Sequence, residues 1–197
     1  MNRNTLAFLA LASLLPLTAC HGTGHEAKAE HEEAVATKPA LSLSQGIAAA
    51  QKQAPNLSLL AAEIEAEGGK TICSVVLTDG KSAREVNIDA MSGALAGTED
   101  EKLGERSLGL VHELTGSGAK IVAASQAITA AEQKAPGSWA FELRLVQGTA
   151  GLQYEIALEG GKERQVAHVS AADGAVLKIE DLEEDDDEGG EAPGGKG

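Results

Sequence analysis

The segment SQGIAAAQKQAP at residues 44–55 recurs as SQAITAAEQKAP at residues 125–136, so that Ser44 corresponds to Ser125. We call this displacement along the chain the repeat offset. It continues without a gap: Leu77 matches Leu158, and Gly93-Ala94 match Gly174-Ala175. Low complexity does not explain the match, because Gln and Pro align together with Ala and Gly. Since internal repeats of this kind mark repeated structural units, we expect two copies of one unit.

Each copy is predicted to begin with a helix. Ser42 and Gln45 have the spacing of a capping box, in which each side chain satisfies a free backbone N–H group. Pro55 ends the helix because proline cannot continue the hydrogen-bond ladder. The second copy has Ala123 in place of the cap serine. The apolar face in the first copy consists of Ile47, Ala50 and Ala54.

Alternating apolar residues predict three strands after each helix, followed by a short fourth strand at residues 94–95 or 175–179. Alternation implies one buried and one wet face, as in an antiparallel sheet covered by a helix. The expected fold class is therefore α+β, with two repeated units, each one helix packed on a small antiparallel sheet of its own. The alternating residues of the first copy are Leu60, Ala62 and Ile64, then Cys73, Val75 and Leu77, then Val86 and Ile88.

The two copies resemble the PepSY domain. That family has a capped helix that ends at proline, a middle strand led by an aromatic residue, and a final Asp-Ala-x-x-Gly-x-Val. The first copy ends in DAMSGAL at residues 89–95, and the second in SAADGAV at residues 170–176, where Ser170 replaces the aspartate. The usual tyrosine is present as Tyr154 but is Cys73 in the first copy.

The resemblance implies a protein that acts by binding. PepSY domains occur in secreted and membrane-associated bacterial proteins, including the propeptides of thermolysin-like proteases, and the family offers no catalytic residues to carry over. We therefore expect no enzyme and no cofactor, and a protein partner such as a peptidase that is restrained on binding. The partner-binding residues remain unassigned.

The first residues have the parts of a secretory signal: Arg3, an apolar run at residues 6–17, and small residues before Cys20. LTAC at residues 17–20 resembles the lipobox of bacterial lipoproteins, which implies cleavage before Cys20 and attachment of lipid, including palmitate, to that cysteine. An ordinary signal peptide with an incidental Cys20 is the alternative. His21, where inner-membrane lipoproteins have Asp, implies an outer-membrane protein facing the periplasm if the cell is Gram-negative.

Charge and composition restrict the partners. The formal net charge is −14, and removal of the signal peptide with Arg3 makes it −15, which argues against binding to nucleic acid. The two cysteines, Cys20 and Cys73, cannot form an intramolecular disulfide if Cys20 is lipidated. No motif for nucleophilic catalysis or phosphate binding is present. Cys73 is expected to be a buried apolar residue, and Trp139 a packing residue that is partly exposed.

The charged ends offer an alternative function. His21, His25 and His31 lie among glutamates, and imidazole with carboxylate can bind zinc, copper or nickel. We favour a solvated linker with no metal site, because flexible ligands lose entropy on binding. The alternative is a metal-handling envelope lipoprotein that uses the His/Glu-rich tether and the acidic tail. His112 and His168 are expected to have no special role. The predicted boundaries are 1–19 signal peptide, 20–40 flexible tether, 41–97 first unit, 98–120 connector with a short helix, 121–181 second unit and 182–197 disordered acidic tail.

Overall fold

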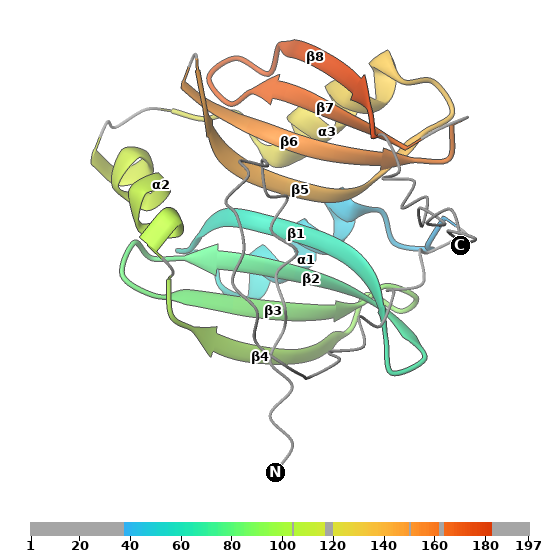
Figure 1. Cartoon of the computed structure of the whole chain (residues 1–197). Coiled ribbons are helices and arrows are strands. Elements are labelled where there is room, and N and C mark those ends of the chain that lie inside the picture. Colours follow the sequence, from blue (N-terminus) through green and yellow to red (C-terminus); the bar gives the residue numbers. More distant parts are fainter. Residues whose placement is uncertain (1–37, 104, 117–119, 150, 162–163, 183–197) are drawn as a thin grey trace, which may run out of the picture. The chain divides into compact units, whose positions relative to one another are not determined.

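The computed structural model describes residues 38–103, 105–116, 120–149, 151–161 and 164–182. These residues form three helices and eight strands (Figure 1). The helices are α1 (Leu43–Gln53), α2 (Glu105–Gly116) and α3 (Ala124–Lys134). The strands are β1 (Ser58–Glu67), β2 (Lys70–Thr78), β3 (Ala83–Asp89), β4 (Leu95–Glu101), β5 (Trp139–Gly148), β6 (Gly151–Glu159), β7 (Gln165–Ser170) and β8 (Val176–Asp181).

The strands form one antiparallel sheet in the order β4-β3-β2-β1-β5-β6-β7-β8. The predicted mixture of helices with an antiparallel sheet is therefore confirmed, but the prediction of a separate small sheet for each copy is wrong. In two separate sheets, β1 and β5 would each be an edge strand with unpaired backbone groups. Pairing β1 with β5 removes both of these edges and leaves β4 and β8 at the margins of the described sheet.

The pairing of β1 with β5 places one residue opposite its own counterpart. Ala62 pairs with Leu143, its equivalent at the repeat offset. Ala61 pairs with Arg144 and Glu63 with Glu142, and the repeat offset exchanges these two pairs with each other. This is the pattern of a two-fold symmetric contact, in which the same patch of each partner faces the other.

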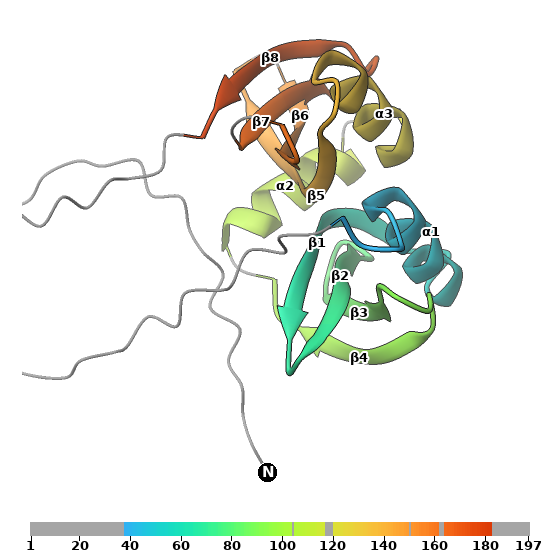
Figure 2. The same cartoon turned by 90° about the vertical axis from the view of Figure 1, so that its right-hand side faces the viewer.

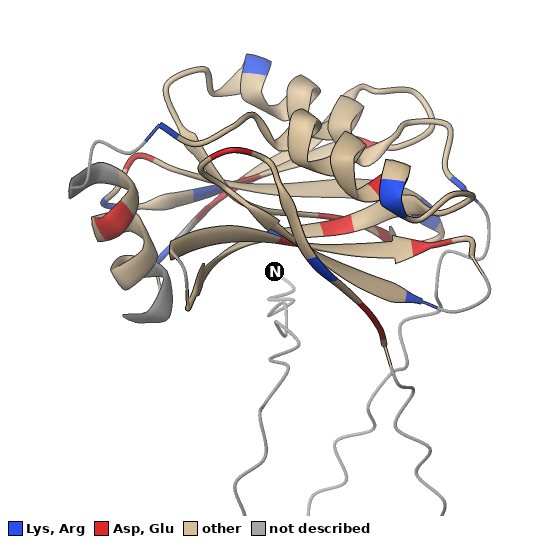
Figure 3. Cartoon of the chain, turned by 90° about the horizontal axis from the view of Figure 1, so that it is seen from above, with Lys and Arg blue, Asp and Glu red and all other residues tan. Residues whose placement is uncertain are grey.

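Two helices cover one face of the sheet. Figures 2 and 3 show α1 and α3 on the same face, and the two helices are also in contact with each other. Ser42 caps α1 as predicted, because its hydroxyl accepts from the Gln45 backbone N–H (3.3 Å) while the Gln45 side chain accepts from the Ser42 N–H (2.9 Å). At α3, Ala123 makes no side-chain cap. The predicted apolar face of α1, namely Ile47, Ala50 and Ala54, is buried.

The bounds of the elements recur at the repeat offset found in the sequence. It carries the start of α1 to the start of α3, and the starts of β1 and β2 to those of β5 and β6. Strand β4 runs from Leu95 to Glu101, well beyond the short strand predicted at residues 94–95, because its ladder with β3 continues to the Ala83–Glu101 pair. The short helix expected in the connector is α2, which contacts β5 and buries Val111.

The core of the first copy is packed around a glycine on α1. Cys73, in the position of Tyr154, is fully buried as predicted. A Cβ atom on Gly46 would lie 2.3 Å from the Cys73 sulfur, so the helix approaches the sheet closely at this point. In the second copy the helix has Ala127, and the Tyr154 hydroxyl donates to the Val122 carbonyl (2.9 Å).

This close approach gives a prediction about stability. Gly46→Ala should destabilise the protein by about 1–3 kcal/mol, the usual cost of an overpacked core. The control is Gly109→Ala on α2, where a Cβ would meet nothing within 4 Å; it should be neutral or stabilise by up to about 1 kcal/mol, because alanine favours helix. Urea denaturation followed by circular dichroism measures both, and equal effects of the two variants would contradict this account of the packing.

Candidate functional site

The predicted lipidation site and the histidines considered as an alternative metal site lie outside the part of the chain that the structure describes. These are Cys20, His21, His25 and His31, together with the rest of the signal peptide, nearly all of the tether and the acidic tail after residue 182. Their assignments stay predictions. Within the described residues, no group of three or more His, Cys, Asp or Glu side chains is arranged to hold a metal ion. None of the helices in that part of the chain is long and apolar enough to span a membrane.

Two residues singled out in the sequence take part in packing. Burial, with a smaller effect from the Glu65 carboxylate, raises the pKa of Cys73 to about 12. The thiol therefore stays protonated and is a poor nucleophile. Trp139 is 7% exposed, so the expectation that it is partly exposed is wrong. Its ring meets Phe141 edge-on at 6.2 Å, and the Arg164 guanidinium lies 5.2 Å from the centre of the Phe141 ring.

His168 links three neighbouring strands, although the sequence predicted no role for it. Its Nε2 lies 2.9 Å from Glu180 on β8, and its Nδ1 lies 3.2 Å from the Gln153 amide on β6. The Glu155 carboxylate is 3.7 Å from the same Nδ1. The two carboxylates lie beside opposite ring nitrogens, so they cannot share one metal ion with this imidazole. Lys178, and to a lesser extent His168, lowers the pKa of Glu180.

The two edge strands of the sheet differ in how they are covered. Helix α3 packs against β5 to β8, whereas the main sheet contacts of α1 are with β1, β2, β3 and β5. On β8, Val176 and Ile179 pack against the core. On β4, the equivalent residues Leu95 and Thr98 are exposed, and of residues 95–100 only Gly97 is partly covered. Strand β4 is thus the barer edge of the two.

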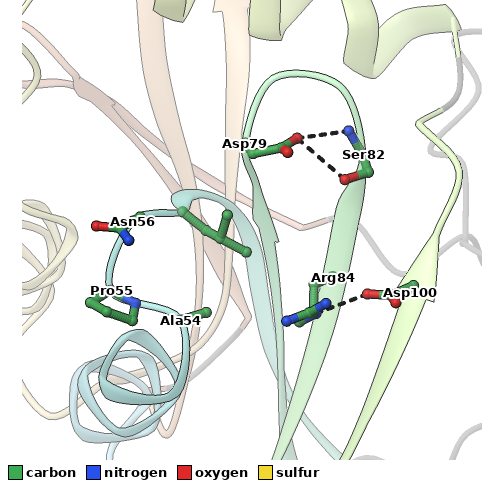
Figure 4. A pocket seen from close by; sticks show the side chains of 8 residues that line it. Ala54, Pro55, Asn56, Asp79, Ser82, Arg84 and Asp100 are labelled. Carbon is green, nitrogen blue, oxygen red and sulfur yellow. Dashed lines mark hydrogen bonds and ion pairs between the residues drawn. The ribbon is translucent and has the colours of Figure 1, made fainter.

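A hollow of about 250 Å³ lies beside β4 and next to the end of α1 (Figure 4). One side is made by the turn that follows α1, and the other by the β2–β3 turn together with β3 and β4. The Arg84 Nε donates to the Asp100 carboxylate at 2.8 Å, and both side chains are largely exposed. The lining residues are Ala54, Pro55, Asn56, Leu57, Asp79, Ser82, Arg84 and Asp100. We call β4 and this hollow together the β4 edge site.

Asp79 shapes the turn that borders the hollow. Its Oδ1 accepts hydrogen bonds from the backbone N–H of Ser82 (2.9 Å) and of Lys81 (2.8 Å), and from the Ser82 hydroxyl (3.2 Å). These bonds, chiefly those from the two N–H groups, hold the pKa of Asp79 below its usual value of 3.8. Asp79 is therefore ionised at neutral pH and adds negative charge to the lining of the hollow.

Comparison with known proteins identifies part of the chain. Residues 121–180 match the family model described as "Peptidase propeptide and YPEB domain", named PepSY. Residues 121–180 form a PepSY domain. This PepSY domain contains α3 and β5 to β7, most of β8, the packed Trp139 and the His168 network. The β4 edge site lies outside the matched range.

Two solved structures are similar to the chain at 18% identity. One is a candidate lipoprotein from Clostridium difficile 630, with a TM-score of 0.46 over 74% of this chain and 96% of that one. The other is the C-terminal domain of YpeB from Bacillus megaterium, with a TM-score of 0.30 over 75% of this chain and 68% of that one. No curated protein matches the chain.

The Asp79 turn gives a prediction about pH. A carboxyl whose pKa is lowered by folding adds stability above its unfolded pKa and loses it as the pH falls through the folded value. Asp79→Ala should therefore lower the urea midpoint at pH 7, and its difference from wild type should shrink as the pH falls below 3.8. Asp79→Asn keeps an acceptor oxygen without the charge, so its urea midpoint at pH 7 should lie between those of wild type and Asp79→Ala. A difference that does not change from pH 7 to pH 2 would contradict the role of the charge.

Proposed function

We propose that this protein is a non-catalytic regulator of the bacterial cell envelope, which binds a protein partner and restrains a peptidase. The match of residues 121–180 to the family of peptidase propeptide and YPEB domains carries the proposal. Domains of this family act by binding, and two side chains of this PepSY domain, Trp139 and His168, make contacts within the domain. Trp139 packs on Phe141, and His168 joins β7 to its two neighbouring strands.

We also propose that residues 41–97 form a second PepSY-like unit, joined to residues 121–181 by a connector at 98–120. The repeat offset supports this, since it relates α1 to α3 and β1 to β5. The turns agree as well: the Gly93 N–H donates to the Asp89 carbonyl (2.8 Å), and the Gly174 N–H donates to the Ser170 carbonyl (2.9 Å). Both glycines have a positive φ, 73° and 77°, which other residues rarely adopt.

The third part of the proposal is a lipid anchor on Cys20, after removal of residues 1–19 as a signal peptide. LTAC at residues 17–20 supports it. Two or more acyl chains are needed for stable attachment, because a single chain binds a membrane only marginally. Residues 20–40 would then be the flexible tether between membrane and sheet. If the cell is Gram-negative, His21 favours the outer membrane, facing the periplasm.

One experiment tests both anchoring and binding. Wild type and Cys20→Ser are expressed in the native host and grown with labelled palmitate, and the membrane fraction is then cross-linked and purified. Wild type should carry label, sediment with membranes and retain one envelope protein, which should bind again when the purified components are mixed. Cys20→Ser should be unlabelled and soluble, and should still bind the purified partner, since the folded part of the chain is unchanged.

Three results would contradict the proposal, each at a different point. Unlabelled, soluble wild type would exclude the lipid anchor. A membrane-bound protein that retains no partner, in cross-linking and in reconstitution, would exclude the binding function. Peptide hydrolysis by the purified protein itself, lost on mutation of its own residues, would exclude the non-catalytic role.

A further inference from the structure

We propose that the β4 edge site binds an extended peptide segment by strand addition, with a lysine or arginine of that segment placed in the hollow beside Asp100. This inference rests on the proposed binding function: the β4 edge site is the binding surface, and the partner presents an extended segment with a basic side chain. In strand addition, backbone hydrogen bonds to a free sheet edge supply affinity, and pockets for alternate side chains supply specificity. The β4 edge site has both parts, a bare edge strand and a hollow next to it.

The exposure of β4 makes it the edge open to a further strand. One side of β4 pairs with β3 from Ile88–Leu95 to Ala83–Glu101, and its other side has no neighbour among the described strands. An incoming strand can therefore use the free backbone groups of β4 without displacing any of these strands. Its side chains would also find space on the helix-bearing face, because the main contacts of α1 end at β3.

The register of β4 defines what the added strand should present on the helix-bearing face. Asp100 pairs with Arg84 and Thr98 with Val86, whereas Leu95 pairs with Ile88. Leu95, Thr98 and Asp100 therefore point to the face on which Val86 and Ile88 join the core. Leu95 is 48% exposed and offers an apolar contact at the start of β4. An antiparallel partner would accordingly carry a polar side chain first, opposite Asp100, and an apolar one later, opposite Leu95.

The charge of the site favours a basic side chain at the polar position. Asp100 and Asp79 both line the hollow, so two carboxylates border the polar position. Arg84 donates one hydrogen bond to Asp100, and Asp100 stays 73% exposed and able to meet a second cation. The stem of a lysine or arginine would lie along Pro55 and Leu57, as the long apolar part of such side chains commonly does on apolar surfaces.

The opposite edge is a poorer match for the same segment. On β8, Val176 and Ile179 pack against the core, so the helix-bearing face of this strand offers less apolar surface to a partner; the exposed Leu177 lies between them in the chain and points to the other face. Lys178 puts a cation in the middle of β8, where β4 has Gly97. The equivalent of the Arg84–Asp100 ion pair is a hydrogen bond from the Gln165 amide to Asp181 (2.9 Å). Asp181 therefore provides a matched control position for Asp100.

The test uses two blocked synthetic peptides and the purified full-length protein. The first is Thr-Lys-Thr-Val-Thr-Leu-Thr, which places Lys, Val and Leu on one side of an extended chain. The second has Glu in place of Lys. In ¹⁵N–¹H NMR spectra, the Lys peptide should shift amide signals of residues 95–101 and of the hollow, and should bind at least tenfold more tightly than the Glu peptide.

Charge reversal separates the Asp100 contact from general attraction to an acidic protein. Asp100→Lys should weaken binding of the Lys peptide at least tenfold and should strengthen binding of the Glu peptide, which shows that the variant is still folded at this edge. Asp181→Lys changes the net charge by the same amount, and its affinities for the Lys peptide and the Glu peptide should stay within twofold of those of wild type. Equal effects of the two variants, shifts confined to β8, or no binding of either peptide would overturn the inference. So would concentration-dependent pairing of two copies through β4 that excludes the Lys peptide.

The inference and the proposed function can fail separately. If the native partner still binds Asp100→Lys as tightly as wild type, the β4 edge site is the wrong surface and the binding function stands. If no partner is found and the Lys peptide binds as described, the surface is correct and the proposed restraint of a peptidase is wrong.

Discussion

The backbone pairing of β1 with β5 is the contact on which the rest of the structure depends. It converts two sets of four strands into one sheet and places Ala62 opposite Leu143, its counterpart in the repeat. Because the contact is two-fold symmetric, α1 and α3 come to lie on the same face and touch each other. Without this pairing, β1 and β5 would both be edges that invite association with other chains. In the described sheet, the exposed edges are β4 and β8, the two margins.

The two edge strands, β4 and β8, differ in their surroundings although the sequence repeat relates them. The part of the chain that matches PepSY has its edge strand packed against α3 and carries the His168 network next to it. In the other half, α1 packs mainly on β1 to β3, and β4 has a hollow beside it. A regulator that binds its partner through one edge needs this asymmetry, because two equivalent open edges would allow chains to join end to end. In the proposed strand addition, Asp100 at the end of β4 would favour a partner segment with a basic side chain.

The helices, strands and buried positions could largely be predicted from the sequence. The β1–β5 pairing and the β4 edge site could not, for physical reasons. The repeat and its alternation predicted the helices, the strands and the buried positions, including Cys73, because burial repeats with the period of each element. The pairing of β1 with β5 could not be predicted, because the alternation of apolar and polar residues in β1 is the same whether or not its second backbone edge is paired. The β4 edge site depends on how far α1 reaches across the sheet. One signal for it was present: Thr98 stands where the second copy has Ile179, a polar residue at an otherwise apolar position.

The most direct test of this account is NMR spectroscopy of the pairing between β1 and β5 in the isotopically labelled protein. The structure predicts nuclear Overhauser contacts between the backbones of Ala61 and Arg144, Ala62 and Leu143, and Glu63 and Glu142, together with slow amide exchange along this part of both strands. If these contacts are missing while those within β1–β2 and β5–β6 are present, and the β1 and β5 amides exchange as those of free edges do, the chain has two separate sheets and the account is wrong.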